Sequence, residues 1–217
     1  MAEGRKSVWG LGPVRAWLAV LAAANVAAAI EIEDVQVTQW VGEGANRALL
    51  VVDWQAPTTI VLGYRWDGAV GGATMMNDIA TLGGRLSVAW HPNYPDQAVF
   101  GMGFDVDGDG GGFSTTAPGV ETGQAQDADD YYAEGWMVQG YWAFYTAPDG
   151  QHWNWPGYGI AGLQLTDGAW VGWSWSPAPT WYGGPPDNIP LIPEPATAML
   201  AAAGLMLFRR GKRLEVR

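Results

Sequence analysis

Three aspartates that alternate along a short glycine-rich segment are the residues best suited to chemistry: Asp105, Asp107 and Asp109. When such a segment curls, carboxylates at alternate positions converge on one point, and Gly110 permits the sharp turn. A hard cation such as Ca²⁺ binds several oxygen ligands in that arrangement. We therefore expect a calcium site here, on a loop that follows a strand ending near Phe104. A solvated hairpin loop without metal is the alternative.

A calcium site built on this segment needs further ligands from elsewhere in the chain. The spacing matches the first half of an EF-hand loop, but the twelfth position is Thr116, where that loop requires a bidentate glutamate. A site of another kind would be completed by the acidic residues that follow, which are Glu121, Asp127, Asp129, Asp130 and Glu134. The spacing alone does not choose among them.

Pairs of these carboxylates could also serve as the acid and base of a glycan hydrolase, for example Asp129 with Asp130 or Asp127 with Glu134. At this density of acidic residues, such pairs arise by chance. The sequence has no Gly-x-Ser-x-Gly nucleophile motif, and its glycine-rich run at 108–112 is acidic and unsuited to cradling phosphate. We therefore expect a protein without catalytic activity and keep glycan hydrolysis as an alternative.

Aromatic side chains form a second candidate site. Eight Trp and Tyr residues crowd into thirty positions: Trp153, Trp155, Tyr158, Trp170, Trp173, Trp175, Trp181 and Tyr182. Exposed rings of this kind stack on the faces of sugars. If the domain is a carbohydrate-binding module acting on exopolysaccharide, we expect Trp153, Trp155, Trp173 and Trp175 to bind the ligand. The alternative is that these rings form the core of a small β domain.

Charge and cysteine content exclude several classes of protein. The chain has 217 residues and a formal net charge of −11, and 19 of its 22 acidic residues but only three of its 11 basic residues lie between positions 30 and 193. A surface this acidic repels nucleic acid, so we expect no nucleic-acid partner. The chain has no cysteine, which excludes disulfides, thiolate nucleophiles and cysteine-type zinc sites.

The elements that would position these residues are mostly strands. Runs of β-branched and aromatic residues bounded by Gly, Pro or Asp predict strands over residues 49–54, 59–66, 85–90, 98–104 and 136–145, and one more after a turn at 166–168. In the run from 136, period-two spacing puts Trp136, Val138, Trp142 and Phe144 on one face.

One helix is predicted, over residues 74–82. Met75, Ile79 and Leu82 form an apolar stripe at positions i, i+4 and i+7, and Gly83 follows as a stop signal. The order of elements predicts an α+β fold that is predominantly antiparallel β with one short helix, flanked by terminal hydrophobic helices. An all-β sandwich is the alternative.

The two ends of the chain indicate export. Residues 1–29 have a basic start, an apolar run over 16–24 and three alanines at 27–29, the pattern of a signal peptide. We expect a globular ectodomain over 30–176 and a proline-rich linker over 177–192.

The C-terminal segment, residues 193–217, has three parts. Pro193, Glu194 and Pro195 precede an apolar run over 196–208, and a basic tail follows. As a helix, this run reaches only about 20 Å, against a hydrocarbon core of about 30 Å. It would therefore reside marginally in a membrane, which suits a temporary anchor, and an ordinary single-pass tail anchor is the alternative.

This tripartite tail resembles the PEP-CTERM sorting signal of exported proteins in Gram-negative bacteria, which an exosortase recognises. The resemblance implies cleavage near the motif, with exosortase and the general secretion machinery as partners. It also implies transient anchoring in the inner membrane and then delivery to the cell surface or extracellular matrix, as in a biofilm. The sorting residues implied are Pro193, Glu194, Pro195, Arg209, Arg210, Lys212 and Arg213.

Overall fold

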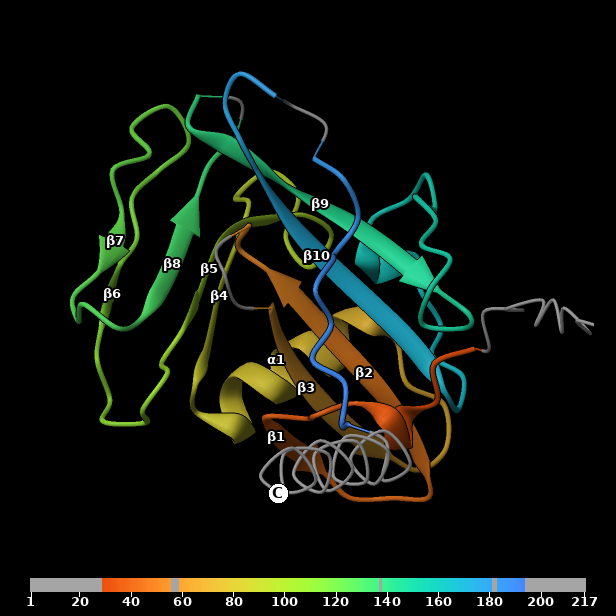
Figure 1. Ribbon diagram of the computed structural model, residues 1–217. Helices are drawn as coiled ribbons and strands as arrows, with labels where there is room; N and C mark the ends of the chain where they lie inside the picture. The colour runs from red at the N-terminus through yellow and green to blue at the C-terminus, as the bar shows by residue number, and fades with distance from the viewer. Residues whose placement is uncertain (1–28, 56–58, 137, 181–182, 194–217) are drawn as a thin grey trace, which may run out of the picture.

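The computed structural model describes residues 29–55, 59–136, 138–180 and 183–193 (Figure 1). Residues 1–28 of the predicted signal peptide and residues 194–217 of the predicted sorting segment lie outside this part, and so do the predicted terminal hydrophobic helices. Among the described residues, no helix is both long enough and apolar enough to cross a membrane.

A mixed five-stranded sheet is the frame of the domain, with the strand order β1-β3-β2-β10-β9. The hairpin β2–β3 and the pair β9–β10 are antiparallel, whereas β1 runs parallel to β3 and β10 runs parallel to β2. Its strands are β1 (Gln39–Gly42), β2 (Asn46–Asp53), β3 (Thr59–Trp66), β9 (Gly140–Ala147) and β10 (Ala169–Pro177).

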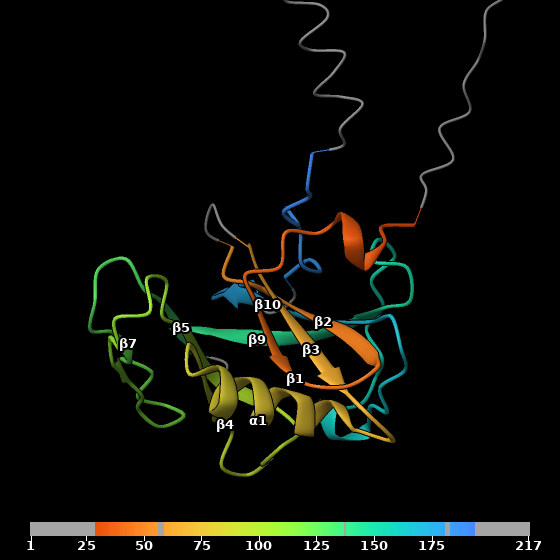
Figure 2. The ribbon, with the colours of Figure 1, turned by 90° about the horizontal axis from the view of Figure 1, so that it is seen from below.

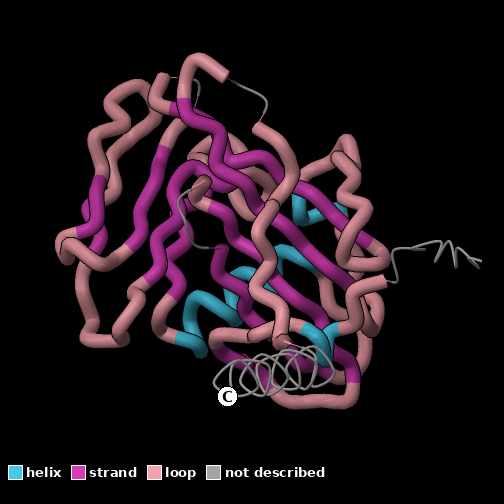
Figure 3. Tube along the Cα trace, viewed as in Figure 1, coloured by secondary structure: helices cyan, strands magenta, loops and turns pink. Residues whose placement is uncertain are grey.

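The remaining strands form two smaller antiparallel sheets, which lie to the left in Figure 1. The sheet β4-β5-β8 consists of β4 (Leu86–Trp90), β5 (Val99–Phe104) and β8 (Tyr131–Glu134), and a two-stranded arm consists of β6 (Phe113–Ser114) and β7 (Gln124–Ala125). Strands and loops make up most of the described chain (Figure 3). The domain is thus β-rich with one α-helix, as the sequence predicts.

The helix α1 (Gly72–Gly83) covers one face of the large sheet (Figure 2). It ends at Gly84, whose φ of 74° closes the helix in the left-handed region. Met75 and Ile79 are buried as the predicted stripe requires, but Leu82 is exposed and Met76 is buried in its place. The main core lies between this helix, the large sheet and the sheet β4-β5-β8.

The opposite face of the large sheet is covered by two chain segments from opposite ends of the domain (Figure 2). One carries the short 3₁₀ helix η1 (Ile32–Asp34), and the other is part of the segment predicted as a linker. Val35 pairs with Leu191, and the Gln36 N–H donates to the Pro190 carbonyl (2.8 Å). This sheet is covered on both faces, and the central residues of β2, Ala48 to Val52, are accordingly all apolar and buried.

The strand predicted over 136–145 begins only at Gly140, so the prediction was wrong for the described residues Trp136, Val138 and Gln139. Trp136 instead bridges to Tyr141 across a turn, and Val138 is exposed. The cause is the buried Glu121 carboxylate, which accepts hydrogen bonds from the backbone N–H groups of residues 136, 138 and 139. These donors are therefore not free to join a sheet ladder.

Candidate metal centre and aromatic cavity

The first acidic loop begins where β5 ends. The Asp105 N–H donates to the Arg85 carbonyl (2.9 Å), and the Arg85 guanidinium donates in return to the carbonyls of Asp105 (2.8 Å) and Val106. The same guanidinium lies over the Phe104 ring, 4.8 Å from its centroid. Arg85 therefore fixes the start of the loop by binding its backbone.

The Asp105 side chain is buried and curls the loop around itself. One carboxylate oxygen accepts from the Gly108 N–H (2.6 Å) and the other from the Gly110 N–H (3.0 Å). Gly108 and Gly110 have φ values of 81° and 87°, which residues other than glycine rarely adopt. The sharp turn expected at Gly110 is therefore present.

The three alternating aspartates converge, as their spacing predicts. One carboxylate oxygen from each of Asp105, Asp107 and Asp109 lies within 4.8 Å of the other two. Oxygens that each lie about 2.3–2.6 Å from one Ca²⁺ ion can be separated by up to about 5 Å, so this spread suits a single ion. Asp107 and Asp109 are exposed, which leaves room for water among the ligands.

A second loop, immediately before β8, brings Asp130 against the first. This side chain is only 8% exposed. Its Oδ1 accepts from the Val106 N–H (2.9 Å), while its Oδ2 is buried without a hydrogen-bond partner in the described structure. A Cβ atom at Gly111 would collide with this Oδ2, so the two loops are in close contact.

The electrostatic surroundings of Asp130 are unfavourable to its charge. Burial raises the pKa of its carboxyl, and the negative charges of Asp105, Asp127 and Asp109 raise it further against the lowering effect of the Val106 N–H. A buried carboxylate oxygen without a donor costs free energy, and a bound cation is one way to offset this cost. Asp130 is therefore the strongest indication of an ion at this place.

Two further aspartates, Asp127 and Asp129, lie on the second loop just before Asp130. Asp127 and Asp129 share a hydrogen bond between their carboxyl groups, which lowers the pKa of Asp127 and raises that of Asp129. The negative charge of Asp107 in the first loop also raises the pKa of Asp129. A Cβ atom built at Gly111 would lie 3.2 Å from the Asp127 Cβ, so this part of the second loop is also close to the first.

Glu134 is a different kind of carboxylate, although the sequence offers it as a ligand. It is buried and accepts hydrogen bonds from the Thr116 N–H (3.0 Å), the Thr116 hydroxyl, the Gly123 N–H (2.7 Å) and the Tyr132 hydroxyl (2.8 Å). Burial alone would raise its pKa, but these donors, above all Thr116, bring the pKa below its ordinary value. Glu134 is therefore saturated by protein donors.

Glu121 is saturated in the same way. Its carboxylate accepts from the backbone N–H groups of Gly119 (3.3 Å), Trp136 (2.9 Å), Val138 (3.2 Å) and Gln139 (2.6 Å). Neither glutamate has an oxygen left over for a metal. Of the five residues proposed to complete the site, the structure places Asp130 and Asp127 beside Gly111 of the first loop, and Asp129 is hydrogen-bonded to Asp127. The oxygens that converge within 4.8 Å are those of Asp105, Asp107 and Asp109.

The four tryptophans proposed to bind sugar lie in different places. Trp155 is 49% exposed, whereas Trp173 is 1% exposed and part of the main core. Trp153 packs on the opposite face of the large sheet, and Trp175 packs against Trp142, with ring centroids 5.4 Å apart. They therefore do not form a common binding surface.

A cavity of about 290 Å³ lies beside two of them. Trp155 and Trp173 line it together with Tyr94, Trp136, Phe144 and Tyr158. Sequence reasoning missed Tyr94 because it lies sixty residues earlier in the chain, in a loop without strand or helix periodicity. His91, which lies in the same loop as Tyr94, is buried, and this burial lowers the pKa of its imidazole. The centroid of the His91 ring lies 4.1 Å from that of Trp136.

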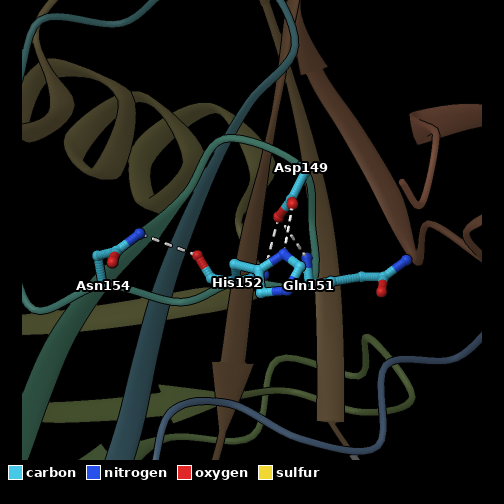
Figure 4. Close-up of polar contacts among 4 residues, drawn as sticks. All are labelled: Asp149, Gln151, His152 and Asn154. Carbon is cyan, nitrogen blue, oxygen red and sulfur yellow. Dashed lines mark hydrogen bonds and ion pairs between the residues drawn. The ribbon is translucent and has the colours of Figure 1, made fainter. Parts of the chain in front are cut away.

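The second histidine belongs to a tight turn after β9 (Figure 4). The Asp149 carboxylate accepts from the backbone N–H groups of Gln151 (3.1 Å) and His152 (2.8 Å), and its Oδ2 lies 2.5 Å from the His152 Nδ1. These contacts lower the pKa of Asp149 to about 2. The Asp149 carboxylate thus closes the turn.

Comparison of the chain with protein-family models, with curated proteins and with solved structures finds no match.

Proposed function

We propose that this chain is an exported, exosortase-sorted, non-catalytic protein of the cell surface or extracellular matrix, whose domain is stabilised by calcium bound between two acidic loops. The observation that carries the calcium proposal is the buried Asp130 Oδ2, which has no hydrogen-bond partner among the described residues and lies beside Gly111 of the loop of converging aspartates. The export proposal rests on the sequence of the two ends.

The ligand set favours calcium for reasons of charge and geometry. Asp105, Asp107 and Asp109 would supply oxygens from one loop and Asp130 from the other, and water would complete the coordination. Hard oxygen ligands suit Ca²⁺ and Mg²⁺, but Mg²⁺ requires near-ideal octahedral geometry, whereas Ca²⁺ tolerates irregular sets of six to eight oxygens. Two separate loops with several carboxylates fit the more tolerant ion.

An extracellular setting is consistent with such a site. Calcium modules of extracellular proteins bind with dissociation constants of about 10⁻⁴–10⁻³ M, so two exposed ligands and partial hydration suffice. The acidic domain, the signal-peptide pattern and the tail that resembles a PEP-CTERM signal all support delivery to that setting. In this proposal Pro193, Glu194 and Pro195 form the motif that exosortase reads.

Calcium titration of thermal stability tests the metal proposal. Calcium at about a hundred times its dissociation constant should stabilise the fold by about 2.7 kcal/mol, which raises Tm by roughly 5–10 °C. Asp107→Asn should remove most of this increase, whereas Asp96→Asn, an exposed acid outside the cluster, should retain it. A wild-type Tm that is unchanged by 10 mM calcium would refute the proposal.

Sorting is tested separately in the native host. Intact-mass measurement and cell fractionation should find a product that lacks the first 29 residues and the tail, outside the inner membrane. Glu194→Ala should leave the tail attached. Recovery of the wild-type chain as a stable inner-membrane protein with its tail intact would contradict sorting and leave the calcium proposal unaffected.

A further inference from the structure

Exposed aromatic side chains are concentrated at one place on this domain. Among the described residues, the exposed large aromatic side chains are Trp40, Tyr94, Trp155 and Tyr158. The last three all line the 290 Å³ cavity. Exposed aromatic surface gathered at a concave site marks binding more than chance exposure does.

Two loops bring these three rings together. Tyr94 comes from the loop between β4 and β5, and Trp155 and Tyr158 come from the loop before the short 3₁₀ helix η2 (Ile160–Gly162). The Ile160 N–H donates to the Gln97 carbonyl (3.2 Å), which ties the second loop to the first. The rim of the cavity is therefore held by a direct contact between its two sides.

Each exposed ring is supported from behind by another ring. The centroid of Tyr94 lies 5.6 Å from that of Trp136, Trp155 lies 6.3 Å from Tyr145, and Tyr158 lies 6.5 Å from Phe144. Rings packed in this way lose little conformational freedom when a ligand binds. The cavity thus offers aromatic surfaces that are largely preformed.

The lining has no charged side chain and contains few polar groups. Gln97 is exposed at the edge, and Tyr94 and Tyr158 carry hydroxyls. Trp173, which also lines the cavity, has an indole N–H without a hydrogen-bond partner in the described structure. An uncharged lining within a strongly acidic domain disfavours anionic ligands and gives a cationic ligand no carboxylate to pair with.

We propose that this cavity binds one neutral pyranose unit of a polysaccharide. A pyranose ring has an apolar C–H face that stacks on aromatic rings and a rim of hydroxyls that hydrogen-bond to amide, phenol and indole groups. The cavity volume is at the lower limit of small-molecule sites, about 300 Å³, which fits a single sugar ring. This binding site is separate from the acidic loops and does not depend on calcium.

Affinity electrophoresis of the purified full-length chain tests the proposal. Native gels would contain hydroxyethyl cellulose, galactomannan, glucomannan or dextran as neutral probes and alginate as an anionic probe, in a detergent without sugar headgroups. Migration should be retarded in at least one neutral gel. Trp155→Ala and Tyr158→Ala should each weaken that retardation by at least about tenfold, the usual loss at a central aromatic contact.

Trp40→Ala is the matched control, since it removes an exposed tryptophan that lies on β1 and does not line the cavity. It should retain full retardation. The two cavity residues are half exposed, so their variants should keep the wild-type melting temperature, measured in parallel. Unretarded migration in every neutral gel, retardation only by alginate, or retardation that survives both cavity substitutions would overturn the proposal.

Discussion

Two groups of buried carboxylates adjoin the sheet β4-β5-β8, and they have opposite surroundings. Glu121 and Glu134 each accept four hydrogen bonds from protein donors. Asp130 accepts one, from the Val106 N–H, and its other oxygen faces the charges of neighbouring aspartates. The three carboxylates are similarly buried, but they differ in the groups that surround them.

The difference separates structural carboxylates from ligand carboxylates. A buried carboxylate surrounded by N–H and O–H donors stabilises the loops that supply those donors. A buried carboxylate surrounded by other carboxylates lacks a counter-charge within the protein, so an ion from solution has a place there. On this criterion the glutamates organise the β6–β7 arm and its neighbouring turn, and Asp130 belongs with the ligands of the proposed calcium site.

Glu134→Gln should give the largest effect and should be independent of calcium. The substituted amide would present its NH₂ group to donors that now bind an oxygen, and unmet buried donors cost about 3 kcal/mol in total. Thermal denaturation followed by circular dichroism should show Tm lowered by roughly 6–12 °C. If calcium restored the wild-type Tm, Glu134 would belong with the ligands and the separation would fail.

Asp130→Asn should behave in the opposite way. In the presence of a chelator, the variant should be more stable than wild type by about 1 kcal/mol, because it removes a buried charge whose Oδ2 has no hydrogen-bond partner among the described residues. The calcium-dependent increase of Tm should disappear. Chemical denaturation with and without calcium measures both effects, and a variant that keeps the full calcium response would exclude Asp130 as a ligand.

Gly111→Ala should weaken calcium binding without removing a ligand. The added Cβ meets the Asp130 carboxylate and lies 3.2 Å from the Asp127 Cβ, so it would push the two loops apart. Overpacking of this kind costs about 1–3 kcal/mol, and 1.4 kcal/mol at the site raises Kd about tenfold. Isothermal titration should show this loss. Gly184→Ala, where the added atom has no neighbour within 4 Å, is the control.

Asp149 extends the comparison to a carboxylate at the surface, and its effect should be the smallest. Donors from residues 151 and 152 lower its pKa to about 2, from an ordinary value near 3.9. Its contribution to stability should therefore be present above pH 4 and be lost as the pH falls through 2. NMR titration of the side-chain carboxyl measures the midpoint, and His152→Ala should raise it; a wild-type midpoint near 4 would contradict the role of these donors.

Local patterns predicted the strands and the first acidic loop well. Runs such as residues 59–66 and the spacing of Asp105, Asp107 and Asp109 contain the relevant information within a few positions. The different hydrogen bonding of Asp130 and Glu134 could not be predicted, because it depends on which carboxylate meets N–H and O–H donors in the folded chain. The wrong strand start at Trp136 has the same origin, since the distant Glu121 takes its N–H group.

The aromatic residues show a second limit of sequence reasoning. Trp155 and Trp173 both line the cavity, yet one is exposed and the other belongs to the core. The crowding of tryptophans in the sequence indicated that aromatic side chains are important in this region, but it did not indicate which of them remain exposed to solvent. That information depends on Tyr94 and its loop, which pack against the region from a remote part of the sequence.

The position of β10 has a consequence for the order in which the domain can form. This strand is the last of the sheet along the chain, yet it lies between β2 and β9, which pair with it on either side. A chain emerging from its N-terminus would expose the unpaired edges of both neighbours until residue 177 arrives. In the export that we propose, the chain would therefore have to cross the membrane as far as residue 177 before the central pairing closes.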